Sequence, residues 1–202
     1  KAARRAAAIA GDVAQGVSPY LTLKGLEWPQ ATINRTLIRE GGENYPAGSL
    51  VIPLTDETGE LVNVPLIRAD GTKRYLHGGQ KAGAFHRIDG GELVAICEGY
   101  ATGLSIHQAT GATVYCAMDC GNLMVVAQIA RRQHPEARIL LCGDNDADTQ
   151  GNPGKTKAEQ AAATVGGLVA LPPVAGDWND YHQAHGLTAT KEAIMSASTA
   201  PV

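Results

Sequence analysis

Two patterns of apolar and polar residues divide the chain, and the change falls near residue 90. Before it, the short apolar runs SLVIPL, ELVNVPLIR and KRYLH alternate with the turn sequences TDETGE and RADGT. Runs of this length predict strands, and the Asp-Gly pair in the second turn predicts a hairpin. Two short helices precede them, one Ala-rich over residues 1–16 and one opened by Ser18-Pro19. Residues 1–90 are expected to form a smaller α+β subdomain with antiparallel strands.

From residue 91 onward, strand-like and helix-like segments alternate. The expected strands are 92–97, 112–117, 137–143 and 168–173, and the expected helices are 99–111, 121–135, 154–167 and 177–186. The strand segments are apolar throughout, as in strands covered by helices on both faces. Such an alternation predicts a parallel sheet. Residues 91–202 are therefore expected to form an α/β domain, a small parallel sheet flanked by helices.

Composition excludes two classes of protein. Hydrophobic residues make up 44% of the 202, enough for a core, so a disordered chain is excluded. No apolar run approaches the roughly 18 residues that a transmembrane helix needs, and the opening KAARRAAAIA lacks the long apolar stretch of a secretory signal. A membrane protein is thereby excluded.

The four cysteines carry no metal or disulfide pattern. They are Cys97, Cys116, Cys120 and Cys142, and no two are spaced as CxxC. Three lie in or beside apolar strand-like runs, where cysteine behaves as a small buried hydrophobe. Reduced core cysteines are favoured over a structural zinc site or disulfides, which indicates the cytoplasm.

Charge differs between the two halves. Residues 1–90 carry 11 Lys and Arg against 9 Asp and Glu, whereas residues 91–202 carry 6 against 11. The second half has carboxylates to offer to metal ions, and the first has cations to offer to phosphates. A difference this modest also arises by chance, so the positions of the charges matter more than their sum.

Carboxylates follow three of the predicted parallel strands. Glu98 comes directly after the first, Asp144 and Asp146 follow the third, and Asp177 follows the fourth after a short loop. In an open parallel sheet, ligands bind at the carboxyl ends of the strands. Carboxylates gathered there repel one another unless a cation joins them, and their hard oxygen atoms suit Mg²⁺ or Mn²⁺. The pattern indicates metal-dependent chemistry on phosphate esters.

Parts of this acidic pattern are also compatible with simpler roles. The run DNDAD could be a solvated acidic turn or half of a calcium loop, but the twelfth position of such a loop is Lys155 instead of Glu. His182 and His185 lie three apart on one face of a predicted helix, so they are either metal ligands or surface residues.

Three segments, VAICEGYATGLSI, ILLCGDNDAD and AGDWNDYHQAHG, together resemble the TOPRIM domain of bacterial-type primases, topoisomerases and some nucleases. The resemblance is closest to the DNA primases of plasmids and phages. The upstream SPYLTLKGL and the run from LVIPL to LHGG resemble the segment that precedes TOPRIM in those primases. The resemblance covers most of the chain. It implies a TOPRIM-type fold and synthesis of short RNA primers on single-stranded DNA during plasmid or phage replication or transfer.

The resemblance also implies roles for individual residues. Glu98 matches the glutamate that acts as a metal ligand or general acid/base, and Asp144 and Asp146 match the pair that holds Mg²⁺. Asp177 matches a later acidic position, with Asp180 as the alternative. All these residues are expected to act at one site.

One departure from the family pattern affects metal binding. Many bacterial primases carry a further Asp four residues after the glutamate, where this chain has Thr102. A second metal ion is then held less tightly, or by Asp148 as an extra ligand.

Basic residues are the expected contacts for nucleotide and template. The candidates are Arg68, Lys73, Arg74, Lys81, Lys155 and Lys157. The implied partners are single-stranded DNA, ribonucleoside triphosphates, and a replicative helicase or a fused helicase or zinc module outside this chain. Aromatic residues are only 4%, so template binding by this part alone is expected to be weak.

Two rival functions remain compatible with the same motifs. A TOPRIM nuclease would cleave phosphodiesters with the same carboxylates. A non-catalytic TOPRIM module would serve as a scaffold and need not bind metal at Glu98 and Asp144. No topoisomerase-type nucleophilic tyrosine motif is evident.

Overall fold

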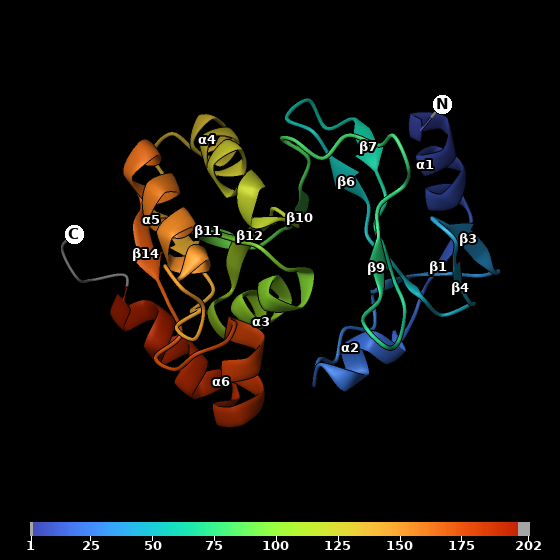
Figure 1. Cartoon of the computed structure of the whole chain (residues 1–202). Helices are drawn as coiled ribbons and strands as arrows, with labels where there is room; N and C mark the ends of the chain where they lie inside the picture. Colours follow the sequence, from blue (N-terminus) through green and yellow to red (C-terminus); the bar gives the residue numbers. More distant parts are fainter. Residues whose placement is uncertain (1, 198–202) are drawn as a thin grey trace. The chain divides into compact units, whose positions relative to one another are not determined.

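The computed structural model describes residues 2–197, and the chain divides into two compact units, Lys1–Ala84 and Phe85–Val202 (Figure 1). The division falls slightly before the change of sequence pattern near residue 90, because the short strand β10 (His86–Ile88) pairs with the sheet of the second unit. Among the described residues, none of the helices has the length and apolarity needed to cross a membrane.

The first unit is built from short elements. They are α1 (Ala2–Gly11), β1 (Val13–Gln15), α2 (Pro19–Leu23), β2 (Thr32–Asn34), β3 (Ile38–Glu40), β4 (Glu43–Tyr45), β5 (Leu50–Val51), β6 (Leu54–Thr55), β7 (Leu61–Asn63), β8 (Leu66–Ile67) and β9 (Lys73–Arg74). Five strands form an antiparallel sheet in the order β1-β2-β5-β8-β9, and β3-β4 and β6-β7 are separate hairpins. The antiparallel strands expected from the sequence are confirmed.

The first unit departs from the expected outline in two ways. Strands β1 to β4 were not expected, because none of them exceeds three residues. The runs SLVIPL and ELVNVPLIR each form two strands instead of one, and Pro53 and Pro65 lie at the breaks. Proline has no N–H to give to a ladder, so a strand ends where it occurs.

The second unit has the expected alternation of strands and helices. Its remaining elements are β11 (Gly91–Cys97), α3 (Tyr100–Thr110), β12 (Ala112–Cys116), the 3₁₀ turn η1 (Cys120–Asn122), α4 (Leu123–Gln133), β13 (Ile139–Cys142), α5 (Pro153–Val165), β14 (Leu168–Ala170) and α6 (Trp178–Ala197). The sheet order is β10-β12-β11-β13-β14, and all but the edge strand β10 are parallel. This confirms the expected α/β architecture, a small parallel sheet flanked by helices and preceded by a part with antiparallel strands.

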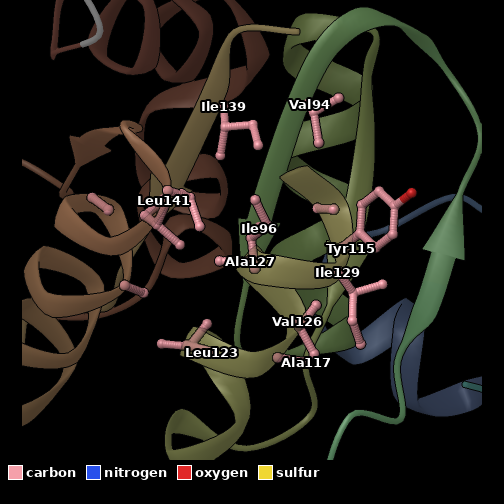
Figure 2. Packing of buried hydrophobic residues seen from close by; sticks show 14 of the residues in the cluster. Val94, Ile96, Tyr115, Ala117, Leu123, Val126, Ala127, Ile129, Ile139 and Leu141 are labelled. Atoms are coloured by element: carbon pink, nitrogen blue, oxygen red, sulfur yellow. The ribbon is translucent and has the colours of Figure 1, made fainter. Parts of the chain in front are cut away.

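One face of this sheet is covered by α4 and α5 and the other by α3 and α6 (Figure 1). The strand side chains that point toward α4 include Val94, Ile96 and Tyr115, and they pack against Val126 and Ile129 of that helix (Figure 2). Burial on both faces explains why the strand sequences are apolar throughout.

Helix α3 lies close to the opposite face of the sheet at Gly103. A Cβ atom added there would lie 2.3 Å from Cys116 Sγ and 3.2 Å from Cys97 Sγ, so only glycine fits. The two thiols are free and 3.9 Å apart, and Cys142 is free and buried as well. The expectation of reduced core cysteines holds for these three, and Cys120 is free but half-buried.

The last helix is broken at one residue. Gly186 has φ +81° and ψ 170°, outside the helical region, so α6 consists of two helical segments. The first segment corresponds to the helix expected over 177–186, and the second was not predicted from the sequence.

Candidate active site

The carboxyl ends of β11, β13 and β14 bring the acidic residues to one edge of the second unit's sheet. Cys97, the last residue of β11, pairs in register with Cys142 of β13, which pairs in turn with Ala170 of β14. Glu98 follows the first of these positions directly and Asp144 follows the second after one residue. Two neighbouring strands are therefore each followed by a carboxylate, and the two positions differ by one residue in register.

Asp144 is the most perturbed acid of this edge. Its pKa is raised to about 7, chiefly by burial and then by the negative charges of Glu98, Asp177, Asp146 and Asp180, in that order. Its Oδ1 atom is buried and has no hydrogen-bond partner. The pKa shift shows that all four other carboxylates lie close enough to repel Asp144. The structure thus brings together the residues expected from β11, β13 and the turn after β14.

Asp146 is tied to the start of α5. Its Oδ2 accepts a hydrogen bond from the backbone N–H of Gly154 at 2.9 Å. A Cβ on Gly154 would lie 2.5 Å from the carbonyl oxygen of Asp144, so the helix can begin this close to the acidic turn only with glycine there. One carboxylate oxygen of Asp146 therefore stabilises the helix start, an arrangement the helix dipole favours.

Asp177 and Asp180 share the first turn of α6. Asp177 Oδ1 accepts from the backbone N–H groups of Asn179 (2.7 Å) and Asp180 (2.9 Å), and Asp180 Oδ2 accepts from the N–H of Asp177 (3.2 Å). This reciprocal pattern is a capping box, with Asp where Glu or Gln is usual. The capping box was not predicted from the sequence, where the two residues stand as alternatives for one role.

The other predicted acids and histidines lie in different surroundings. Asp148 is exposed in the turn beyond Asp146, and Thr102 is buried in α3. His182 Nδ1 lies 3.0 Å from Ser105 Oγ, and burial lowers the pKa of His182. The ring of His185 packs 4.4 Å from that of Tyr181.

Two asparagines that were not predicted from the sequence organise the acidic turns. Asn145 forms an isolated antiparallel bridge with Gly176, and Asn152 caps α5 in a left-handed conformation with φ 40°. The cap at Asn152 could have been predicted from the sequence, because Asn before Pro is a common helix start. The contacts of Asn145 could not have been predicted, because its partners lie about 30 residues further along the chain.

Residues 2–197 contain no group of three or more His, Cys, Asp or Glu side chains already arranged as metal ligands. The donor set nevertheless fits a hard divalent cation, because it consists of carboxylates alone. The unpartnered Oδ1 of Asp144 and the repulsion among the five acids are both relieved by a positive charge at this edge.

The two lysines of α5 differ in their surroundings. Lys155 Nζ lies 2.6 Å from Glu159 Oε1, an i,i+4 ion pair on the helix surface. Lys157 acts on Cys120: burial raises the pKa of that thiol, Glu98 and Asp119 raise it further, and Lys157 lowers it. Lys157 is exposed on α5 and lies close enough to Cys120 for its charge to act on that thiol. Asp119 follows β12 and was not among the residues predicted from the sequence.

The basic residues of the first unit are also unequal. Arg68 bonds Asp70 at 2.7 Å and Glu43 at 3.1 Å, and its hydrogen bond lowers the pKa of Asp70. Its charge is already matched by two carboxylates. Lys73 and Lys81 lie with their Nζ atoms 5.7 and 4.3 Å from the ring centre of Tyr75.

Arg74 lies beside the first of these lysines. Its Nη1 donates to the backbone oxygen of Lys73 at 3.3 Å, so this hydrogen bond goes to a neutral group. The guanidinium group of Arg68, by contrast, is held by two carboxylates.

A family model described as the Toprim domain matches residues 93–188. Two curated proteins from Escherichia coli, both named DNA primase TraC, are 36% identical to the chain over 174 residues, which is 81% of this chain. The chain spans only 16% and 11% of their lengths.

Solved primase structures share the fold. The RNA polymerase domain of Mycobacterium tuberculosis primase DnaG superposes with a TM-score of 0.56 at 18% identity, over 95% of this chain and 71% of that one. The primase fragment of the bacteriophage T7 primase-helicase protein gives 0.55 at 15% identity, over 89% and 68%. At these identities the likeness concerns the fold.

Proposed function

The chain carries a Toprim domain over residues 93–188, and from that premise we propose that it is the catalytic core of a DNA primase. The proposed reaction is template-directed transfer of a nucleotidyl group to the 3′-hydroxyl of a growing RNA. The identity to the two TraC primases supports the substrate class. The single observation that carries the proposal is Asp144, a half-buried carboxylate surrounded by four others at the carboxyl edge of the sheet.

Glu98, Asp144 and Asp146 would hold the divalent cation, with Asp177 and Asp148 as further ligands. A bound Mg²⁺ or Mn²⁺ lowers the pKa of an attacking hydroxyl and neutralises the triphosphate. The capping box leaves Asp177 Oδ2 free of backbone bonds, and the bond to Gly154 leaves Asp146 Oδ1 free of them. Each residue can therefore keep its part in the fold and still offer an oxygen atom.

The protein's own residues also account for proton transfer and orientation. Asp144, with a pKa of about 7 in the metal-free protein, can exchange a proton near neutral pH, and the neighbouring Glu98 is proposed to accept the proton of the attacking hydroxyl. Lys157, whose charge acts on Cys120 near the acidic edge, is proposed to hold a triphosphate oxygen, with Lys155, already paired with Glu159, as a weaker contact. The roles proposed for Lys157 and Lys155 rest on their positive charge and on their positions on α5.

Lys73, Arg74 and Lys81 are proposed to bind the template or the incoming nucleotide. Arg68 is the weakest of the four candidates because two carboxylates already compete for its guanidinium group. Single-stranded DNA and ribonucleoside triphosphates are the proposed partners. A helicase is proposed as well, since one solved relative is a primase-helicase. The free cysteines are consistent with a reducing compartment such as the cytoplasm.

Primer synthesis tests the proposal. The wild-type chain, given ribonucleotides, Mg²⁺ or Mn²⁺ and single-stranded template, is expected to make short RNA. The double variant Asp144→Asn/Asp146→Asn is expected to lose at least about 100-fold in rate while keeping its fold. Glu192→Gln, an exposed carboxylate change in α6, is the matched control. Full activity of the double variant would refute the proposal.

The same assay separates the rival functions. A Toprim nuclease would shorten the DNA template and make no RNA. A scaffold module would do neither, and would also show no divalent-cation binding that depends on Asp144.

A further inference from the structure

Asn145 connects the acidic turn after β13 to the turn that leads into α6. Its backbone N–H and carbonyl oxygen each bond to Gly176 at 3.0 Å. Its side-chain Nδ2 donates to the carbonyl oxygens of Pro172 (3.0 Å) and Val174 (3.2 Å). Four hydrogen bonds from one residue therefore hold the segment that ends at Asp177.

Asn152 supports Asn145 from the other side. Its Nδ2 donates to Asn145 Oδ1 at 2.9 Å, while its Oδ1 accepts from the backbone N–H groups of Asp146 (3.0 Å) and Lys155 (3.3 Å). Asn152 holds φ 40°, a left-handed conformation that asparagine tolerates better than most residues. The side chain of Asn145 is thereby fully bonded and fixed in orientation.

These bonds oppose a repulsive force. Asp144 and Asp146 flank Asn145, and the turn it holds ends in Asp177, so like charges on the two turns push the turns apart. A neutral amide between the two aspartates adds no charge. It also offers two donors to the carbonyl oxygens of the opposite turn, which an aspartate could not do.

We propose that Asn145 is a positioning residue, which holds the turns of Asp144 and Asp177 together so that their carboxylates can share one divalent cation. It is not itself a ligand, because Asn152 and the carbonyl groups of the opposite turn occupy its polar atoms. The inference rests on the proposed function, since it assumes that the acidic edge binds a cation.

Mn²⁺ binding to the full 202-residue chain tests this role. The free-ion signal in electron paramagnetic resonance gives the dissociation constant of the wild type, of Asn145→Ala and of a matched control, Asn34→Ala. Asn34 is a buried residue of the first unit whose Nδ2 also donates to two carbonyl oxygens, those of Thr36 and Tyr45. Its replacement removes two side-chain hydrogen bonds, against three for Asn145, at a position far in sequence from Glu98, Asp144 and Asp177.

Asn145→Ala is expected to weaken Mn²⁺ binding about ten-fold or more, as loss of a residue that orients metal ligands does. Asn34→Ala should stay within about two-fold of the wild type although urea unfolding shows it destabilised. Loss of stability without a change in Mn²⁺ affinity would mean that Asn145 has a structural role only, and would overturn the inference.

Failure of the inference and failure of the proposed function give different results. Mn²⁺ binding that Asp144→Asn abolishes but Asn145→Ala leaves unchanged overturns the positioning role alone. Absence of any Mn²⁺ binding by the wild type overturns both. Should Asn145→Ala not fold, Asn152→Gly replaces it, since glycine keeps the left-handed backbone and removes the bond to Asn145. An unchanged Mn²⁺ affinity in that folded variant also overturns the inference.

Discussion

The half-buried carboxylate of Asp144 should destabilise the metal-free protein near neutral pH. Its pKa rises from 3.8 to about 7 on folding, chiefly through burial and then through the charge of Glu98. At about 1.4 kcal/mol for each pKa unit, this corresponds to roughly 4 kcal/mol at pH 8. Asp144→Asn removes the charge at nearly constant shape, and burial of the amide costs about 1 kcal/mol. The variant is therefore expected to be about 3 kcal/mol more stable than the wild type.

The pH dependence has a definite sign. Because the pKa of Asp144 is higher in the folded protein, the folded state binds more protons than the unfolded state between pH 4 and pH 7. The stability of the wild type should therefore fall as pH rises through this range and level off above pH 7. Asp144→Asn lacks this component.

Urea unfolding in the presence of a chelator measures the effect. The free energy of unfolding is compared between the wild type and Asp144→Asn at about pH 5 and pH 8, and the difference between the two proteins isolates Asp144 from other titrating groups. The difference in the free energy of unfolding between Asp144→Asn and the wild type should be larger at pH 8 than at pH 5. Glu192→Gln, which neutralises an exposed acid of α6, should show no such difference.

A metal-free Asp144→Asn protein that is less stable than the wild type at pH 8 would refute the reasoning. It would mean that the carboxylate makes favourable interactions in the folded state which outweigh its burial and the repulsion of its neighbours.

Three further outcomes are expected. Ser105→Ala should lower the free energy of unfolding in urea by about 0.5 to 1.5 kcal/mol, because it removes the hydrogen bond that Asn179 Nδ2 donates to Ser105 Oγ; an unchanged midpoint would contradict this. Gly103→Ala should lower the free energy of unfolding by about 1 to 3 kcal/mol, because the new methyl group would contact Cys116 Sγ. Adding Cys116→Ala should restore much of this loss, and strictly additive effects of the two substitutions on stability would contradict the clash. Lys157→Ala should weaken ribonucleoside triphosphate binding about five- to ten-fold in fluorescence titration, and equal binding would remove Lys157 from the site.

The parallel sheet could be predicted because its physical cause is local in the sequence. Strands β12 and β13 and the second half of β11 are buried on both faces, which makes these segments largely apolar and distinguishes them from the helices. The strands of the first unit were harder to predict, since they are two or three residues long and a periodic pattern of apolar residues cannot be recognised in so few positions. Prolines marked the breaks at Pro53 and Pro65, but their effect within a strand-like run was not anticipated.

The acidic edge could be anticipated only in part. Glu98 and Asp144 each follow a predicted strand, and because parallel strands end at one edge of a sheet, the two residues could be expected to lie at that edge. Asp177 both caps α6 and raises the pKa of Asp144 through its charge, and the cap could not be predicted because it depends on backbone geometry.

Partners distant in sequence were hidden for a similar reason. The ion pairs of Arg68 and the links from Asn145 to the turn before α6 join residues that no local pattern connects. The different surroundings of Lys155 and Lys157 depend on which way each faces from α5.

Crystallography with Mn²⁺ tests most directly whether acids from separate strand ends share a cation. Crystals of the chain grown or soaked with Mn²⁺ would be measured at a wavelength where manganese scatters anomalously. We predict an anomalous peak that contacts Asp144 and at least one of Glu98 and Asp177. A peak bound elsewhere, or none at this edge while Mn²⁺ is bound in solution, would contradict a shared cation.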